Sequence, residues 1–132
     1  MTDTQTHDIV EHASPMPFDE TLDHLVQAIT ARGMTIFARI DHAANARDAD
    51  LSMPNTTVLI YGSAKAGTPI MLATPLAALD LPLRVLLRQR EDGKVVVAFH
   101  PIASMLLQVG VPEEAAARLE PGQRLLLAAI GL

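Results

Sequence analysis

The sequence predicts an α/β fold of the α+β type, a two-layer sandwich in which a mixed β-sheet has helices packed on one face. Three observations support this prediction. Residues 56–61 (TTVLIY) are β-branched and apolar as in a strand, residues 19–32 show a helical apolar stripe, and Asp92-Gly93 separates two apolar-rich segments. The expected order along the chain is strand, helix, strand, strand, helix, strand, strand, helix, in a single domain over residues 1–132.

The first helix and its flanking strands are predicted from hydrophobic periodicity. Residues 8–14 indicate a short strand that ends at Pro15. The helix over 19–32 ends at Gly33, and its apolar residues recur at spacings of three and four: Leu22, Leu25, Val26 and Ile29. Residues 34–40 alternate as a strand does, and the helix is long enough to join the two strands as parallel neighbours.

The middle of the chain is less regular. Residues 41–51 are polar and Ala-rich, so that either a loop or a short helix fits them. After the strand over 56–61, Thr68 and Pro69 form a favourable cap and first-residue pair, and a helix is expected to begin there. Pro75 is expected either to kink that helix or to restart it.

The remaining segments predict a hairpin and a helical end. Residues 83–88 and 94–99 are expected to pair antiparallel across Asp92-Gly93, with positive φ at both turn positions. Beyond Pro101 the pattern becomes helical, in three pieces over 102–109, 112–119 and 125–130. We expect residues 1–7 to be flexible.

Composition excludes several classes of protein. The 132 residues hold 10 basic and 15 acidic side chains, a formal charge of −5, and no cysteine, which excludes disulfides, thiolate metal sites and cysteine nucleophiles. The acidic balance, three Phe, one Tyr and no Trp argue against nucleic-acid binding. The longest clean apolar run, 125–130, is too short for membrane insertion, and the first twelve residues show no secretory signal, which favours the cytoplasm.

The pair Asp41 and His42 is the first candidate site, because it stands where a strand gives way to a loop. An imidazole beside a carboxylate suits general acid–base catalysis. The alternative is that Asp41 caps a turn and His42 packs or lies at the surface. A metal site would need His42 and His100 to converge with Asp41 or Asp80, and we predict neither a metal nor a cofactor.

The segment Gly62 to Thr68 is the second candidate. It resembles a phosphate-binding loop but lacks the Lys and Ser/Thr that must follow the second glycine, so nucleotide hydrolysis is not expected. An anion at the helix start near Gly67 and Thr68, with Lys65 adding charge, is one interpretation, and a well-capped turn is the other. Asp80 lies among apolar residues, and either pairs with Arg84 or caps a turn.

Five ordered blocks of the chain resemble the bacterial domain of unknown function 302 family over residues 9–101. They are FDETLDHL (18–25), GMTIFARIDHAANA (33–46), GTPIM (67–71), LDLPLRVLL (79–87) and GKVVVAFHP (93–101). The resemblance implies an α/β sandwich, self-association into dimers and no established reaction, and leaves 102–132 as a helical C-terminal extension. The positions emphasised by the family's motifs correspond to Thr21, Asp41, His42, Gly67, Thr68, Asp80, Leu81, Pro82 and Arg84.

These observations favour a homodimeric module that binds a small molecule or anion, with a groove near Asp41, His42, Thr68 and Asp80. Lys65, Gly67 and Arg84 are expected to contribute to the binding of a small anionic ligand. A surplus of apolar residues supports the dimer. The alternative is an enzyme that uses His42 as general acid or base, oriented by Asp41 or Asp80.

Overall fold

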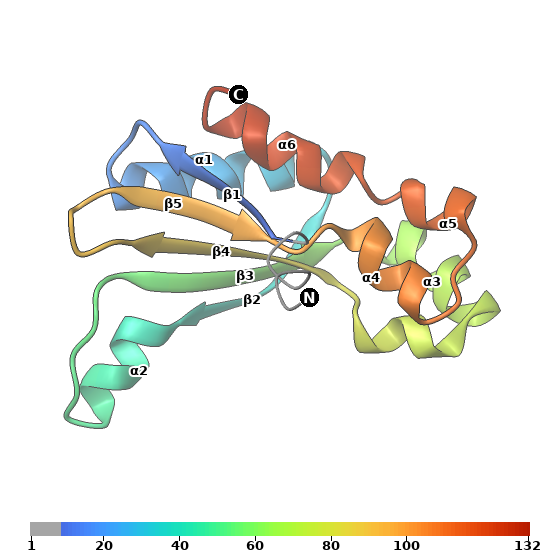
Figure 1. Cartoon of the computed structure of the whole chain (residues 1–132), viewed down its shortest axis with the longest axis horizontal. Coiled ribbons are helices and arrows are strands. Elements are labelled where there is room, and N and C mark those ends of the chain that lie inside the picture. The colour runs from blue at the N-terminus through green and yellow to red at the C-terminus, as the bar shows by residue number, and fades with distance from the viewer. Residues whose placement is uncertain (1–8) are drawn as a thin grey trace, which may run out of the picture.

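The computed structural model describes residues 9–132, which form a five-stranded sheet in the order β1-β5-β4-β3-β2 (Figure 1). The strands are β1 (Val10–Ser14), β2 (Thr35–Asp41), β3 (Thr56–Gly62), β4 (Leu83–Gln89) and β5 (Val95–Phe99). The helices are α1 (Phe18–Ala31), α2 (His42–Asp48), α3 (Ala64–Ala73), the 3-10 helix η2 (Pro75–Leu79), α4 (Ile102–Gln108), α5 (Glu113–Ala117) and α6 (Pro121–Ala129). The flexibility predicted for residues 1–7 lies outside the described residues.

The two-layer α/β sandwich is confirmed, but its sheet is antiparallel throughout and not mixed. All four neighbouring strand pairs run antiparallel. The prediction that α1 joins parallel neighbours is wrong because β1 and β2, although they point the same way, lie at opposite edges of the sheet. The connection through α1 therefore crosses the whole width of the sheet, and β1 pairs with β5.

The helical stripe of α1 is confirmed and faces the core. Leu22, Leu25 and Ile29 are buried, and Val26 packs against them. At the start of this helix the buried Thr21 hydroxyl donates to the Pro17 carbonyl oxygen over 2.9 Å. Helix α1 packs beside α6 on one face of the sheet, where the inward strand residues are buried: Leu59, Tyr61, Val85, Leu87 and Val97.

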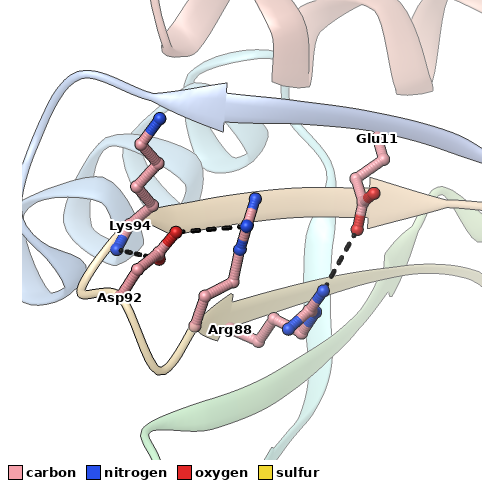
Figure 2. A network of polar contacts seen from close by, with 5 residues as sticks. Glu11, Arg88, Asp92 and Lys94 are labelled. Atoms are coloured by element: carbon pink, nitrogen blue, oxygen red, sulfur yellow. Dashed lines mark hydrogen bonds and ion pairs between the residues drawn. The ribbon is translucent and has the colours of Figure 1, made fainter.

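The β4–β5 hairpin is confirmed, with a different turn from the one expected. Only Gly93 has a positive φ, of 89°, and Asp92 does not. The Gly93 N–H donates to the Arg90 carbonyl oxygen over 2.9 Å, and the Asp92 carboxylate accepts from the Lys94 N–H over 3.0 Å (Figure 2). A single glycine in the left-handed region therefore closes this turn.

Helix α3 begins earlier than the Thr68-Pro69 pair predicted. Ser63 is its N-cap, with its hydroxyl oxygen accepting from the Ala66 N–H over 3.2 Å, and Pro69 lies inside the helix. The segment 63–67 is thus a cap and first turn instead of a loop. Pro75 restarts the chain as η2, and α2 is the short helix that residues 41–51 allowed.

The C-terminal helices belong to the same core as the sheet. The buried Gln123 side chain of α6 accepts from the Ile102 N–H over 2.9 Å and donates to the His100 carbonyl oxygen over 2.8 Å. The Tyr61 hydroxyl donates to the Gly122 carbonyl oxygen over 2.8 Å. These bonds join α6 to β3, to the end of β5 and to the start of α4. Helices α3, α4 and α5 gather at one end of the sheet, and α2 lies at the other (Figure 1).

Candidate functional site

The single groove expected near Asp41, His42, Thr68 and Asp80 is not formed. In the β2–β3 pair, Asp41 lies opposite Thr57 and the start of β2 lies opposite Gly62. Helix α3, which contains Thr68, follows Gly62, and α2 follows Asp41. Asp41 and His42 thus stand at one end of the β2–β3 pair and Thr68 at the other. At the rise of an extended chain, the two ends are separated by roughly 20 Å.

Asp41 serves as the N-cap of α2. Its Oδ1 accepts from the Ala44 N–H over 2.9 Å, as expected for the turn-cap alternative. His42 is the first residue of α2 and is exposed. The Asp41 carboxylate is therefore held by the backbone of its own helix.

Asp80 and Arg84 do not pair. The ion pairs within residues 9–132 are Arg88–Glu11, Arg90–Asp92 and Arg124–Glu120. Asp80 is half-buried and is the residue at which η2 ends, with its backbone N–H donating to the Ala77 carbonyl oxygen over 3.0 Å. Lys65 is exposed on α3.

An apolar pocket with a volume of about 240 Å³ lies where α3 meets the end of the sheet. It brings together two of the predicted ligand-binding residues, Gly67 and Thr68, with Leu81 and Pro82 from the family's motifs. The rest of the wall consists of Met34, Phe37, Gly62, Ser63, Ala64, Ala66, Met71, Leu83, Arg118, Leu119 and Gly122. Asp41, His42, Lys65, Asp80 and Arg84 are not among the lining residues.

Small residues create this pocket. A Cβ on Gly67 would lie 3.8 Å from Leu81 Cδ1, an ordinary contact distance, so the missing side chain leaves space in the pocket. A Cβ on Gly122 would lie only 2.8 Å from Leu83 Cδ1, so this glycine lets α6 approach the start of β4 closely. The hydrogen bond from the Tyr61 hydroxyl to Gly122 holds the same wall in place.

Few charged side chains line the pocket. Among the lining residues that the structure describes, Arg118 alone is charged, and it is exposed. Behind the wall, burial raises the pKa of the Tyr61 phenol far above its usual value, so the hydroxyl stays neutral and donates its hydrogen bond. The pocket therefore favours apolar contact over charge recognition.

Several lining residues carried no functional signal in the sequence. In the sequence, Pro121-Gly122 indicates an interruption of secondary structure, and Met71 is interpreted as a core residue. Arg118 and Leu119 belong to the helical end of the chain. They reach the pocket only because α5 and α6 fold back to the sheet, which local patterns do not encode.

A second, shallower hollow of about 680 Å³ lies on the sheet face opposite α1 and α6. Arg84, His42 and His100 all border it, beside residues of α2 and of three strands. The two histidines thus share a hollow, but within the described range no three His, Asp or Glu side chains come together as metal ligands.

The comparisons with known proteins identify the family and the fold. A family model described as "Domain of unknown function DUF302" matches residues 10–128, which extends the match beyond 9–101 into the C-terminal helices. The fold is similar to that of a crystal structure of an uncharacterized conserved protein DUF302 from Bacillus stearothermophilus, with a TM-score of 0.80 and 14% sequence identity. That alignment covers 93% of this chain and 95% of the other.

Two curated relatives are described as fluoride-specific ion channels. FluC 1 of Brucella suis biovar 1 is 37% identical over 76 residues, which is 58% of this chain and 30% of the relative. FluC 1 of Brucella abortus biovar 1 is also 37% identical over 76 residues, covering 28% of its length. The alignment thus spans less than a third of these relatives. Among the helices of residues 9–132, none combines the length and apolarity that crossing a bilayer requires.

Proposed function

Given that this chain belongs to the DUF302 family of domains of unknown function, we propose that it is a binding module for a small, mainly apolar molecule. The observation that carries this proposal is the apolar pocket between α3, the Leu81-Pro82 segment and the start of α6. Four positions that the family's motifs emphasise, Gly67, Thr68, Leu81 and Pro82, line it. A concave apolar site with few polar groups is the usual form of a small-molecule site.

The size of the pocket limits the ligand. A dry apolar cavity of about 150 Å³ holds benzene, and pockets for drug-sized ligands begin at about 300 Å³. A volume of about 240 Å³ lies between these values. A bicyclic or branched hydrocarbon skeleton with one polar substituent matches it, and the Ser63 and Thr68 hydroxyls are the groups available to meet that substituent.

Binding is better supported than the enzymatic alternative. The enzymatic alternative, in which Asp41 or Asp80 orients His42 as general acid or base, needs one of these carboxylates within hydrogen-bonding reach of the His42 ring. The Asp41 carboxylate instead accepts from the Ala44 N–H, and Asp80 stands at the end of η2 without lining the pocket. The hydrogen bond of Asp41 favours a structural role for its carboxylate, and the position of Asp80 sets it apart from the pocket.

We propose further that two copies of this chain associate through a surface formed by Leu72, Leu76 and Leu79. These leucines are 79%, 60% and 72% exposed, respectively. The segment 66–79 that contains them has no charged residue, although the chain carries a net charge of −5. A neutral apolar surface lets two like-charged copies meet, and exposed apolar patches commonly mark such interfaces.

The dimer is tested by sedimentation equilibrium across micromolar concentrations. The dimer mass is expected for the natural chain and the monomer mass for Leu76→Asp. The matched control is Leu51→Asp, because Leu51 is similarly exposed in the α2–β3 connection, outside the proposed surface. A monomer mass for the natural chain at every concentration would exclude the dimer.

The curated relatives support a modular role. In proteins described as fluoride-specific ion channels, the segment similar to this chain is under a third of the whole. We infer that the domain works as a ligand-binding unit that can be joined to a larger protein.

The pocket is tested with indole, a bicyclic and mainly apolar probe. Because the chain has no Trp, indole fluorescence reports binding without tryptophan emission from the protein. We expect saturable binding that is weakened by Ala66→Phe, whose ring would occupy the pocket, and unchanged by Ala78→Phe, outside the lining. Saturable binding that Ala66→Phe leaves unaltered, or no binding up to millimolar indole, would contradict the proposed site.

A further inference from the structure

The sheet face opposite α1 and α6 has an apolar band with a cationic end. Val58, Leu86 and Ala98 lie side by side on β3, β4 and β5, because Val58 pairs with Leu86 and Leu86 pairs with Ala98. All three line the hollow of about 680 Å³. Continuing the β4–β5 register by one same-face pair places Arg84 opposite His100, and both also line the hollow.

Arg84 differs from the other arginine that β4 presents on this face. Arg88 pairs with Glu11 of β1 across the intervening β5, with 3.5 Å between Nη2 and Oε2 (Figure 2). Arg84 lies four residues earlier on the same strand, and no ion pair in the described part of the chain includes it. Within residues 9–132, strand β4 thus presents on this face Arg88, which has an ion-pair partner, and Arg84, which has none.

The border of the hollow has a consistent sign of charge. Besides Arg84, the polar residues of the described range 9–132 that line it are His42, Asn45, Thr56 and His100, and no carboxylate of that range is among them. The side chains of His42, Asn45 and His100 can each donate a hydrogen bond, whereas the Thr56 hydroxyl already donates to the Pro54 carbonyl oxygen over 2.8 Å. In a chain with a net charge of −5, a hollow that the described residues line with an arginine and without an acidic side chain favours an anion.

We propose that this hollow binds a small amphipathic monocarboxylate, with its carboxylate against Arg84 and its hydrocarbon chain along Val58, Leu86 and Ala98. The hollow runs from the level of Thr56 to that of Arg84, four residues of strand or about 13 Å, which suits an unbranched chain of medium length. The guanidinium can hold a carboxylate through two parallel hydrogen bonds. This site is separate from the proposed apolar pocket, since the two share no lining residue.

The test is a titration of the full chain with sodium octanoate, followed by calorimetry and by amide chemical shifts. Two further probes separate the contributions: 1-octanol has the chain without the charge, and acetate has the charge without the chain. We expect octanoate to shift the amides of Leu86, Ala98 and α2, and to bind at least tenfold more tightly than either probe. Shifts confined to Gly67, Leu81 and their neighbours would place octanoate in the apolar pocket and overturn the proposal.

Two variants locate the carboxylate and the chain. Arg84→Gln should weaken octanoate binding about tenfold or more, since it removes the hydrogen bonds that the charged guanidinium makes to the carboxylate. Arg47→Gln is the matched control, because it removes the same charge from exposed α2 outside the lining. Ala46→Phe should fill the hollow from α2 and abolish octanoate binding while indole binding persists.

Each outcome bears on this site alone. Equal affinity of Arg84→Gln and the natural chain would overturn the proposal, as would equal loss in Arg84→Gln and Arg47→Gln, which would indicate a general effect of net charge. An absence of octanoate binding at millimolar concentration would also overturn it. Indole binding measured on the same samples shows whether the apolar pocket stands independently.

Discussion

Replacing Gly67 by alanine should raise the stability of the fold and lower its affinity for indole. Gly67 is buried within α3, and its φ is not in the left-handed region, so alanine fits the backbone. The added Cβ would lie 3.8 Å from Leu81 Cδ1 and 3.9 Å from Met71 Cε, both ordinary contact distances. Glycine inside a helix costs about 0.5–1 kcal/mol relative to alanine, so the free energy of unfolding should rise by about that amount.

The same methyl group points toward residues of the apolar pocket. It should remove space that a bound indole occupies, and a loss of affinity of several-fold is expected while stability increases. Few mechanisms raise stability and lower indole affinity at the same time, because a damaged fold loses both. The assays are urea unfolding followed by circular dichroism, with the slope m expected to stay unchanged, and indole fluorescence titration.

Lys65→Ala is the matched control for Gly67→Ala. Lys65 is exposed in the same helix and does not line the pocket, so its replacement should leave indole affinity unchanged. If Gly67→Ala destabilised the fold, the packing described around α3 would be incorrect. If it stabilised the fold and left indole affinity unchanged, indole would bind elsewhere and the proposed function would lose its main support.

Three further predictions follow from buried and capping groups. Burial raises the pKa of Tyr61, the one tyrosine, so this phenol ionises at lower pH in the unfolded chain than in the folded one. The contribution of Tyr61 to stability should therefore be constant below about pH 10 and fall above it, and absorbance at 295 nm should show no phenolate in the folded chain near pH 11. A Tyr61→Phe variant should lose this alkaline dependence, and an early phenolate signal in the folded natural chain would contradict the burial of Tyr61. Gln123→Met keeps the side-chain size but leaves two backbone groups without their partner, so urea unfolding should report a loss of about 2–4 kcal/mol, against little change in exposed Arg124→Met. Asp41→Ala should lower the free energy of unfolding by about 0.5–2 kcal/mol, because it removes the cap of α2. Asp41→Asn and His42→Ala should leave stability close to that of the natural chain. Equal losses in Asp41→Ala and Asp41→Asn would show that capping is not the role of Asp41.

Local sequence patterns predicted most of the secondary structure. The apolar stripe of α1, the β-branched run of β3 and the glycine turn between β4 and β5 depend on neighbours within one element or one turn. In each case the competing conformations differ over a few residues, so residue type and spacing decide between them. The start of α3 was missed because Ser63 and Thr68 are both good caps, and the sequence alone does not rank them.

The pairing of the strands and the composition of the sites depended on the tertiary structure. The sequence shows that a helix separates β1 from β2, but only packing determines that α1 crosses the sheet and that β1 pairs with β5. The same register places Asp41 and Thr68 at opposite ends of β2 and β3, which divides the predicted groove into two separate places.

The sequence by itself therefore determined an α/β sandwich, its main elements and a set of polar residues near strand ends. The tertiary structure decided which of them meet: Gly67 and Thr68 join an apolar pocket at the end of the sheet, completed by Gly122 from α6. Arg84 joins a different hollow on the sheet face opposite α1 and α6. The physical reason is one of range. Propensity and periodicity act over a few residues, whereas a pocket is formed by contacts between segments far apart in the chain, which all the elements packing together select.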